Sequence, residues 1–286
     1  MTLRSPQELR SAFAALHRPG DPLVLPNAWD VASALLLADT AEAVGTTSLG
    51  VTAAAGLPDG ARAAGGPSLA LATALAGRLD VPLTVDLEDG GSDDPAEVAE
   101  LAARLASVGV AGVNLEDGRP GGGLRDPDHH AAVVAAVVDV GLFVNARTDT
   151  FWIGDGTDRL AETVRRLATY RDAGAHGVFV PGLTDLRGVE TVVAVGPPVN
   201  VLWEPGADLA ALARAGVARV STGSALYRHA LGAALATAAS VREGSRPAVA
   251  PVAYADLQER LAGGPVSPGP PDPGGMPARP QASPPG

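Results

Sequence analysis

The 286-residue chain contains neither cysteine nor lysine, and these two absences narrow its chemistry. Without cysteine there is no disulfide, no thiolate nucleophile and no cysteine metal site. All 21 basic residues are arginine, so a Schiff-base mechanism has no amine to use except the amino terminus. A metal ion acting as a Lewis acid is still a way to activate a carbonyl group.

Aromatic residues, positive charge and long apolar runs are also scarce. Aromatic residues make up 3% of the chain, so its core has to be built from Ala, Val and Leu, which suits helices packed on a parallel sheet. The net charge of −11 argues against nucleic acid as a partner, because phosphate contacts need a basic surface. No signal-peptide pattern and no uncharged apolar run of about 18 residues occurs, so we expect a cytoplasmic protein without a membrane span.

Short apolar runs alternate along the chain with longer segments that have helical spacing. The predicted strands are Leu23–Leu25, Val44–Thr47, Leu83–Leu87, Gly112–Leu115, Phe143–Ala146, Gly177–Val180, Val199–Leu202 and Arg219–Val220. The predicted helices that follow them are Asp30–Asp39, Pro67–Arg78, Asp94–Val108, Asp128–Val138, Asp158–Ala173, Thr184–Val195, Ala207–Ala215 and Ser224–Glu243. Strand–helix repetition indicates an α/β fold, either a barrel or a large doubly wound sheet, and the count of eight favours the (β/α)8 TIM-type barrel.

The composition changes abruptly after this repetitive part. Residues 263–286 are largely Pro, Gly and Ser, which cannot bury enough surface to offset the cost of ordering. We therefore predict a single barrel domain over residues 1–262, followed by a disordered tail.

The predicted strands end in polar residues, which a barrel gathers around one pocket. Asp86 and Glu88 are two residues apart, so on an extended chain both are expected to face the same side. Glu116 follows the neighbouring strand, and the three carboxylates are predicted to converge. A divalent cation would relieve their repulsion, and oxygen-only ligands favour Mg²⁺ or Mn²⁺. The alternative roles for these carboxylates are helix caps or ion pairs with Arg147.

Two other segments are candidates for binding an anionic substrate. The planar guanidinium of Arg147 can hold a carboxylate or phosphonate through two hydrogen bonds, and its alternative role is as a buried counter-ion for Glu116. Ser48, Leu49 and Gly50 stand where the second strand turns. Their backbone N–H groups form a candidate anion nest.

Six segments together resemble the isocitrate lyase/phosphoenolpyruvate mutase superfamily. They are Pro26–Asp30, Thr46–Gly50, Gly56–Gly60, Val85–Gly90, Asn114–Gly118 and Asn145–Asp149. The resemblance implies a barrel that binds Mg²⁺ with a pyruvate-like or enolpyruvate-like ligand, and chemistry that makes or breaks a C–C or P–C bond next to an enolate. It also implies a homodimer or homotetramer whose subunits exchange the eighth helix, here about Ser224–Glu243.

The same resemblance implies roles in metal binding and proton transfer. Asp86 would ligate the metal directly, while Glu88 and Glu116 would mostly hold its water ligands. Asp59 would lie on a mobile loop that closes over the substrate. Asp59 or Glu116 would serve as the proton donor or acceptor, and nothing in the sequence decides between them.

Substrate-binding roles follow from the resemblance in the same way. A 2-oxo acid would be bound through backbone and hydroxyl groups of Ser48, Leu49 and Gly50, next to the metal on Asp86. Arg147 would hold the far carboxylate or phosphonate, which belongs to the leaving or migrating fragment.

The chain departs from the family pattern at three places. Glu88 stands where many members have Asp. The lyase branch carries a Lys-Lys/Arg-Cys-Gly-His loop, whereas the corresponding stretch Arg119–Arg125 has neither Cys nor Lys. Mutases have a His after the sixth strand, where this chain has Pro181. These departures disfavour cleavage of isocitrate or methylisocitrate by the usual mechanism and a standard mutase reaction.

The sequence therefore predicts a Mg²⁺-dependent enzyme that stabilises the enolate of a small 2-oxo acid, with C–C bond lysis favoured. Phosphonopyruvate hydrolase-type or mutase-type P–C chemistry and decarboxylation of a 2-oxo acid are the alternatives within the enzyme class. A barrel that binds a 2-oxo acid without turnover is the alternative of another class, because the acid/base loop is missing. A third possibility, besides an enzyme and a non-catalytic binding protein, is a barrel that merely supports interactions of its Pro-rich tail.

Overall fold

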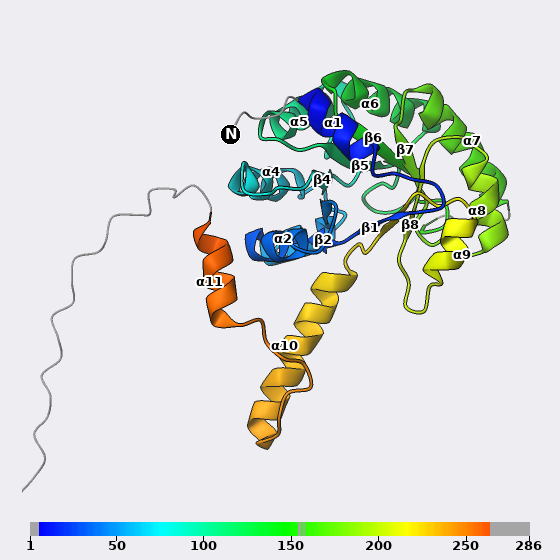
Figure 1. Ribbon diagram of the computed structural model, residues 1–286. Helices are drawn as coiled ribbons and strands as arrows, with labels where there is room; N and C mark the ends of the chain where they lie inside the picture. Colours follow the sequence, from blue (N-terminus) through cyan, green and yellow to red (C-terminus); the bar gives the residue numbers. More distant parts are fainter. Residues whose placement is uncertain (1–5, 154–155, 157, 264–286) are drawn as a thin grey trace, which may run out of the picture.

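A computed structural model describes residues 6–153, 156 and 158–263 of the chain, and its central feature is a barrel of parallel strands (Figure 1). The strands are β1 (Leu23–Leu25), β2 (Asn27–Ala28), β3 (Val44–Thr46), β4 (Leu83–Asp86), β5 (Gly112–Glu116), β6 (Phe143–Arg147), β7 (Gly177–Phe179), β8 (Val199–Leu202) and β9 (Arg219–Ser221). Each of β2 to β8 pairs in parallel with the next strand along the chain.

The barrel closes at Pro26, which divides its first strand into β1 and β2. β1 pairs with β9, with Leu25 opposite Ser221, while β2 pairs with β3. Side chains reinforce this seam, because Asn27 N donates to Thr222 Oγ1 at 2.9 Å and Gly223 N donates to Asn27 Oδ1 at 2.9 Å. Counted as one strand, β1 and β2 complete an eight-stranded barrel, and the predicted (β/α)8 fold is confirmed.

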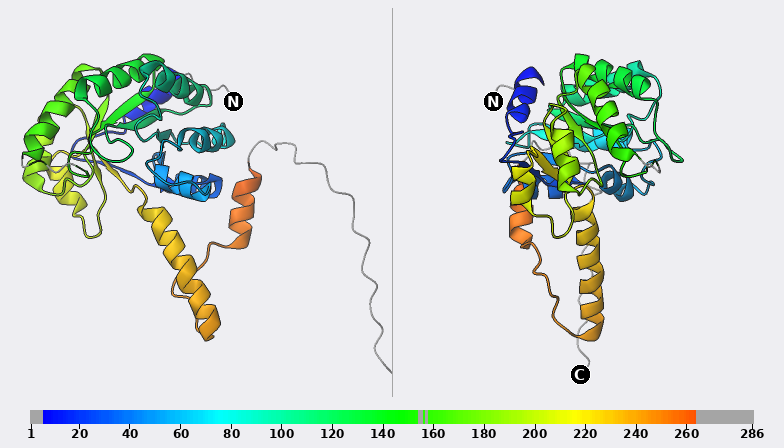
Figure 2. Two further views of the ribbon diagram at one scale, coloured as in Figure 1. Left: turned by 180° about the vertical axis from the view of Figure 1, so that it is seen from behind. Right: turned by 90° about the vertical axis from the view of Figure 1, so that its right-hand side faces the viewer.

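Helices surround the barrel (Figures 1 and 2). They are α1 (Pro6–Ala14), α2 (Val31–Ala38), α3 (Ser48–Ala54), α4 (Gly65–Leu75), α5 (Pro95–Ser107), α6 (Pro127–Val140), α7 (Arg159–Asp172), α8 (Leu186–Val193), α9 (Leu209–Arg214), α10 (Ala225–Glu243) and α11 (Tyr254–Ala262). Every predicted helix and strand is found within three residues of its predicted ends. The helices α1, α3 and α11 were not predicted.

Most barrel helices begin at an aspartate whose carboxylate accepts a hydrogen bond from a backbone N–H of the first turn. Such a cap satisfies a donor that the helix itself leaves unpaired, and is typically worth about 1 kcal/mol. In α5 and α6 a proline follows the cap at the first helical position, where its missing N–H costs nothing. The capping residues are Asp30, Asp94, Asp126, Asp158, Asp185 and Asp208.

The main hydrophobic core lies between the barrel and its helices and consists almost wholly of Val, Leu and Ala, as the scarcity of aromatic residues predicts. A smaller cluster lies where α1 meets the barrel, and there Phe13 packs edge-on against Phe143 with ring centroids 5.2 Å apart. The barrel interior contains buried polar groups. Arg219 there is fully buried and donates to Asn114 Oδ1 and Ser221 Oγ, and burial lowers its pKa to about 9.

The last two helices leave the barrel wall. α10 projects away from the barrel, and α11 returns beside α2 (Figures 1 and 2). Arg260 on α11 pairs with Asp39, and Arg78 donates to the carbonyl of Leu261 at 2.8 Å. Within the part of the chain that the structure describes, no helix has the length and apolar character needed to cross a membrane. The predicted disordered tail lies, from residue 264 onward, outside the described residues.

Candidate active site

A cavity of about 180 Å³ lies where the carboxyl ends of β4, β5 and β6 meet. This is the end of a barrel at which residues from successive strands converge. Five of the predicted site residues line it, namely Ser48, Asp59, Glu88, Glu116 and Arg147. The rest of its lining consists of Gly60, Asp89, Gly118, Arg119, Pro120, Asp149, Trp152 and Ile153.

Glu88 reaches the cavity by a different backbone path from the one predicted, and Asp86 is not among the residues that line the cavity. The strand β4 ends at Asp86, and Glu88 has a left-handed backbone with φ of 53°, so the two are not on one extended stretch. A non-glycine residue in this region is strained and is found mostly where function or packing requires it. Here the turn directs the Glu88 carbonyl to accept the N–H of Glu116 at 2.9 Å. The turn therefore ties the ends of β4 and β5 together.

Arg147 is the central cation of the site. Its Nη1 lies 2.6 Å from Glu116 Oε2, and its Nε lies 2.6 Å from Asp149 Oδ1. Its guanidinium also stands 5.6 Å above the centre of the Phe179 ring. The counter-ion role considered from the sequence is thus present. Two of the five guanidinium N–H donors are used in these pairs, which leaves others for a ligand.

Ser48, Leu49 and Gly50 form the first turn of α3 and not a loop as the nest interpretation required. Their N–H groups therefore sit at the positive end of a helix. Ser48 N donates to Asp86 Oδ2 at 3.3 Å, whereas Leu49 and Gly50 are not among the residues that line the cavity. A Cβ at Gly50 would lie 2.8 Å from that of Trp29, so close packing explains this glycine.

The segment that carries Asp59 is attached to the strand ends by its backbone and by a salt bridge. Gly60 N donates to Glu88 Oε1 at 2.9 Å. Arg62, whose φ is 58°, pairs through Nη2 with the buried Asp89 and with Asp93, each at 2.7 Å. These contacts hold Asp59 against the cavity, next to Glu88.

The acidic groups of the site disturb one another's protonation. Burial, and then the nearby Asp59 and Asp86, raise the pKa of Glu88 from 4.5 to about 7. Burial raises the pKa of Glu116 well above its ordinary value despite the opposing effect of Arg147. Burial also raises the pKa of Asp149. Perturbed carboxyl groups in a cavity are typical of functional sites.

The side chains of the site offer oxygen donors that suit a divalent cation. Clustered carboxylates with raised pKa values are what a Mg²⁺ ion would relieve, and all the donors are oxygen. In residues 6–153, 156 and 158–263, no three acidic, His or Cys side chains already stand close enough to hold a metal among themselves. Mg²⁺ usually keeps several waters, so a site with one direct ligand would not show such a triad. The donor set fits, and the ligand roles stay predictions.

Asp117, which the sequence analysis did not assign to the site, anchors the segment that carries Arg147 and Asp149. Its fully buried carboxylate accepts hydrogen bonds from Thr148 Oγ1 at 2.8 Å and Asp149 N at 2.9 Å. It also accepts from Tyr170 Oη at 2.6 Å and from Arg166 Nη1 at 3.0 Å, both on α7. The network fixes the end of β6 relative to α7.

The stretch Arg119–Arg125, which corresponds to the acid/base loop of the lyase branch, forms a small hairpin. Gly118 and Leu124 form an antiparallel bridge, and Arg119 N donates to Gly123 O at 3.1 Å. Arg125 is buried and pairs with Asp89 at 3.0 Å, so its role is structural. Pro181 stands two residues after β7, which is the sixth strand of the sequence analysis. The position after this strand is therefore the one predicted.

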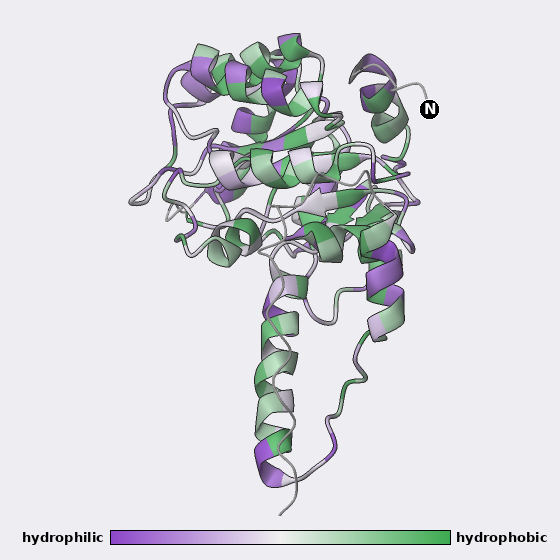
Figure 3. Ribbon diagram, turned by 90° about the vertical axis from the view of Figure 1, so that its left-hand side faces the viewer, coloured by the Kyte–Doolittle hydropathy of each residue, from purple (hydrophilic) through white to green (hydrophobic). Residues whose placement is uncertain are grey.

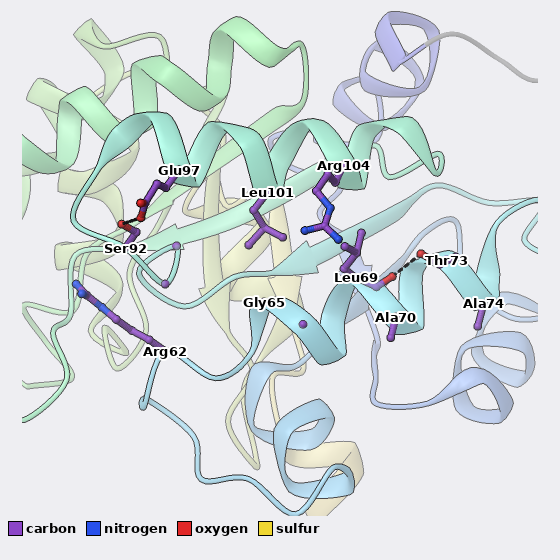
Figure 4. Close-up of a pocket in the computed structure, with 13 residues that line it drawn as sticks. Arg62, Gly65, Leu69, Ala70, Thr73, Ala74, Ser92, Glu97, Leu101 and Arg104 are labelled. Carbon is purple, nitrogen blue, oxygen red and sulfur yellow. Dashed lines mark hydrogen bonds between the residues drawn. The ribbon is translucent and has the colours of Figure 1, made fainter.

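A second and larger hollow, of about 870 Å³, lies outside the barrel between α4 and α5 (Figure 4). Small residues of α4 form much of one wall, and Leu101 and Arg104 of α5 form part of the other (Figure 4). Its polar groups include Glu97, which binds Ser92 Oγ at 2.5 Å. No cluster of acidic groups with disturbed pKa values lines this hollow, so the strand-end cavity is the better candidate for chemistry.

Comparison with protein families and sequences identifies related proteins. The family model described as phosphoenolpyruvate phosphomutase matches residues 13–242. An uncharacterised protein of Mycobacterium tuberculosis is 46% identical over 255 residues, which cover 87% of this chain and 96% of that protein. An oxaloacetate decarboxylase of Pseudomonas entomophila is 28% identical over 247 residues, covering 79% and 82% of the two chains.

Two solved structures are also similar to the chain. A protein of Burkholderia cenocepacia that has been proposed to be a phosphonomutase is 38% identical, with a TM-score of 0.76 and coverage of 81% of this chain and 99% of that one. A phosphonopyruvate hydrolase in complex with oxalate and Mg²⁺ shares the fold, with 20% identity, a TM-score of 0.76 and coverage of 89% and 95%.

Proposed function

The chain belongs to the phosphoenolpyruvate phosphomutase family, and from this premise we propose that it is a Mg²⁺-dependent enzyme acting on a small 2-oxo acid through its enolate. The observation that carries the proposal is the set of carboxylates around one cavity at the strand ends, with the pKa of Glu88 raised to about 7. The binding of oxalate and Mg²⁺ by phosphonopyruvate hydrolase, which has the same fold, supports it. Oxalate resembles the enolate of pyruvate.

Each group of the site would contribute a distinct effect. Asp86 would hold the cation, with Glu88 and Glu116 on its waters, and the bound ion would polarise the 2-oxo group as a Lewis acid. Ser48 and the first turn of α3 would orient the carboxylate of the substrate. Arg147, fixed by Glu116 and Asp149, would hold the far end of the substrate where negative charge changes during the reaction.

The proton donor or acceptor is best sought at Asp59. Its carboxyl group lines the cavity beside Glu88, whose pKa it helps to raise, and it has no proposed role at the cation. A carboxyl group in this position could transfer a proton to or from a bound substrate. We favour Asp59 over Glu116, whose carboxylate is engaged with Arg147.

We favour C–C bond lysis, for which the relationship to oxaloacetate decarboxylase is the specific support. The similarity to the Burkholderia protein supports P–C chemistry as the second candidate. Incubation with 2-oxo acids and with phosphonates separates the two, since P–C hydrolysis releases phosphate and a mutase converts the phosphonate into a phosphate ester, whereas C–C lysis does neither. Affinity for these compounds without turnover at any pH would identify a binding protein.

The first test is calorimetric titration with oxalate in the presence of Mg²⁺ or of EDTA. We expect binding that requires Mg²⁺ and that weakens at least tenfold in Asp86→Ala, since outer contacts alone typically change metal affinity by about 10–100-fold. Asp126→Asn is the control variant, because it alters an exposed helix cap that does not line the cavity. Metal-independent binding, or none in the wild type, would disprove the proposed function.

The same titration has an expected pH dependence. Without metal, Glu88 is protonated below its pKa of about 7, and a cation must displace this proton. Metal-dependent affinity should therefore rise between pH 6 and pH 8, by up to about tenfold per pH unit below the pKa, and then level off. In Glu88→Gln this part of the pH dependence should disappear.

We also propose that the protein is a homo-oligomer, assembled through α10. None of the residues of α10 is buried, and Leu235 on it is 74% exposed. Hydropathy colouring shows apolar residues along the projecting helix (Figure 3). Sedimentation should give a dimer or tetramer, and Leu235→Glu should shift it toward monomer at micromolar concentration. A wild-type monomer would contradict this proposal.

A further inference from the structure

The strand-end cavity has two chemically different ends. Its buried part, the inner end, is lined by most of the carboxylates and by Arg147. Its exposed part, the outer end, presents Trp152, Ile153 and Pro120 beside the charged Asp59 and Arg119, and Trp152 is 57% exposed although it lines the cavity. An apolar surface at the mouth of a polar site marks a place where a ligand or partner removes it from water.

Backbone hydrogen bonds fix the apolar end relative to the inner end. Trp152 N and Ile153 N both donate to the carbonyl of Asp149, each at 2.9 Å. Asp149 is itself bound to Arg147 by its side chain and to Asp117 by its N–H. The two apolar residues therefore stand on the same hydrogen-bonded segment as the cation of the site.

The opposite wall lies close to both Asp149 and Ile153 at Gly118. A Cβ at Gly118 would overlap Asp149 Oδ2 and would lie 3.6 Å from Ile153 Cδ1. A glycine is therefore needed at this position, where the hairpin packs directly against Asp149. Pro120, two residues further along the hairpin, supplies an apolar surface without an N–H donor.

The charges of the lining limit what the outer group of a ligand can be. Five carboxylates line the cavity, on Asp59, Glu88, Asp89, Glu116 and Asp149. The cations are Arg147 and Arg119, and Arg119 is paired with Asp93 at 3.5 Å. A second carboxylate at the outer end would meet repulsion from these groups and an apolar surface, whereas an alkyl group would be stabilised there.

The cavity is small, at about 180 Å³, and Trp152 belongs to its exposed lining. A substituent on a 2-oxo acid that is bound next to the buried carboxylates and Arg147 would therefore extend toward Trp152.

We infer that the substrate is a monocarboxylic 2-oxo acid, or its 2-hydroxy precursor, that carries an alkyl group, and that Trp152 and Ile153 bind this group. The inference rests on the proposed function, since the inner end has to hold the 2-oxo acid unit. It makes Trp152 and Ile153 specificity-determining residues and predicts that an acid with an alkyl group binds more tightly than a dicarboxylate of similar size.

The test uses oxamate and its N-methyl, N-propyl and N-butyl derivatives, which present the same 2-oxo acid unit with an alkyl group of increasing length. Dissociation constants are measured with Mg²⁺ for the wild type, Trp152→Ala, Trp152→Phe and the control Leu209→Ala on α9. We expect affinity in the wild type to rise along the series, by about fourfold for each methylene group that becomes buried. In Trp152→Ala the affinity should rise much less with alkyl length. In Trp152→Phe and in the control Leu209→Ala it should rise as in the wild type.

Three other results would overturn either the alkyl subsite or the proposed function. Equal affinity for all four compounds in the wild type overturns the alkyl subsite while leaving the proposed function standing. An equal rise in the wild type and in Trp152→Ala shows that the alkyl group lies elsewhere and also overturns it. Absence of Mg²⁺-dependent binding for every compound, oxamate and oxalate included, overturns the proposed function itself.

Discussion

Arg147→Met should destabilise the metal-free protein by about 3–5 kcal/mol at pH 8, the usual cost of removing one partner from a buried ion pair. The guanidinium lies within 2.6 Å of two carboxylates, on Glu116 and Asp149. Burial already raises the pKa of both carboxyl groups while Arg147 lowers it. The variant keeps a side chain of similar length but leaves two buried acids without a counter-ion. Urea unfolding followed by circular dichroism measures the loss.

The pH dependence of that loss identifies its cause. In the variant, protonation of Glu116 and Asp149 removes their charge, so the loss should be smaller at pH 5 than at pH 8. The control is Arg165→Met, which removes an exposed pair with Glu162 at 2.7 Å and should cost less than about 1 kcal/mol. A loss in Arg147→Met as small as in the control, or the same at both pH values, would show that the site carboxylates do not depend on Arg147.

Asp117→Asn should cost about 3–5 kcal/mol as well, because it removes the charge that compensates the buried Arg166. The carboxylate of Asp117 accepts four hydrogen bonds, two from the end of β6 and two from α7. Asparagine has the same shape but places an NH₂ group where donors already point. Thermal and urea unfolding measure the effect on stability.

The Asp117 variant should also disturb the site, which distinguishes it from a simple core defect. The N–H of Asp149 loses its acceptor, so the segment that carries Arg147 should shift and Mg²⁺-dependent binding of oxalate should weaken in the folded variant. Tyr170→Phe removes a single hydrogen bond to Asp117 and should cost about 1 kcal/mol. Normal stability of Asp117→Asn, or oxalate affinity equal to that of the wild type, would contradict the positioning role.

The general plan of the fold was predictable because its signals are local. Each barrel strand is a short apolar run and most helices follow an aspartate cap, so boundaries could be placed within three residues. The helix α3 was missed because its seven residues are too few to show a period, and they were interpreted as a strand turn. Likewise, the division of the first strand at Pro26 depends on pairing with β9, which no local pattern reveals.

The candidate site was predictable where polar residues follow strands and was not predictable where contacts cross the chain. Ser48, Asp59, Glu88, Glu116 and Arg147 meet around the cavity as expected. The backbone turn at Glu88 and the bond from Tyr170 to Asp117, which spans 53 residues, leave no trace in the sequence. Trp152 and Ile153 gave no signal either, because apolar residues after a strand normally indicate core.

The seam at Pro26 bears on how the barrel is assembled during protein synthesis. The first strand of the barrel emerges early, but its partner on one side is β9, and the hydrogen bond from Asn27 to Thr222 joins residues 195 positions apart. Until that distant segment leaves the ribosome, β1 has an unpaired edge and the nascent chain exposes apolar surface. Contacts of such sequence separation form slowly and leave partly folded chains prone to aggregation. Barrel closure is therefore a late event, and truncation before β9 would leave an open sheet with two free edges.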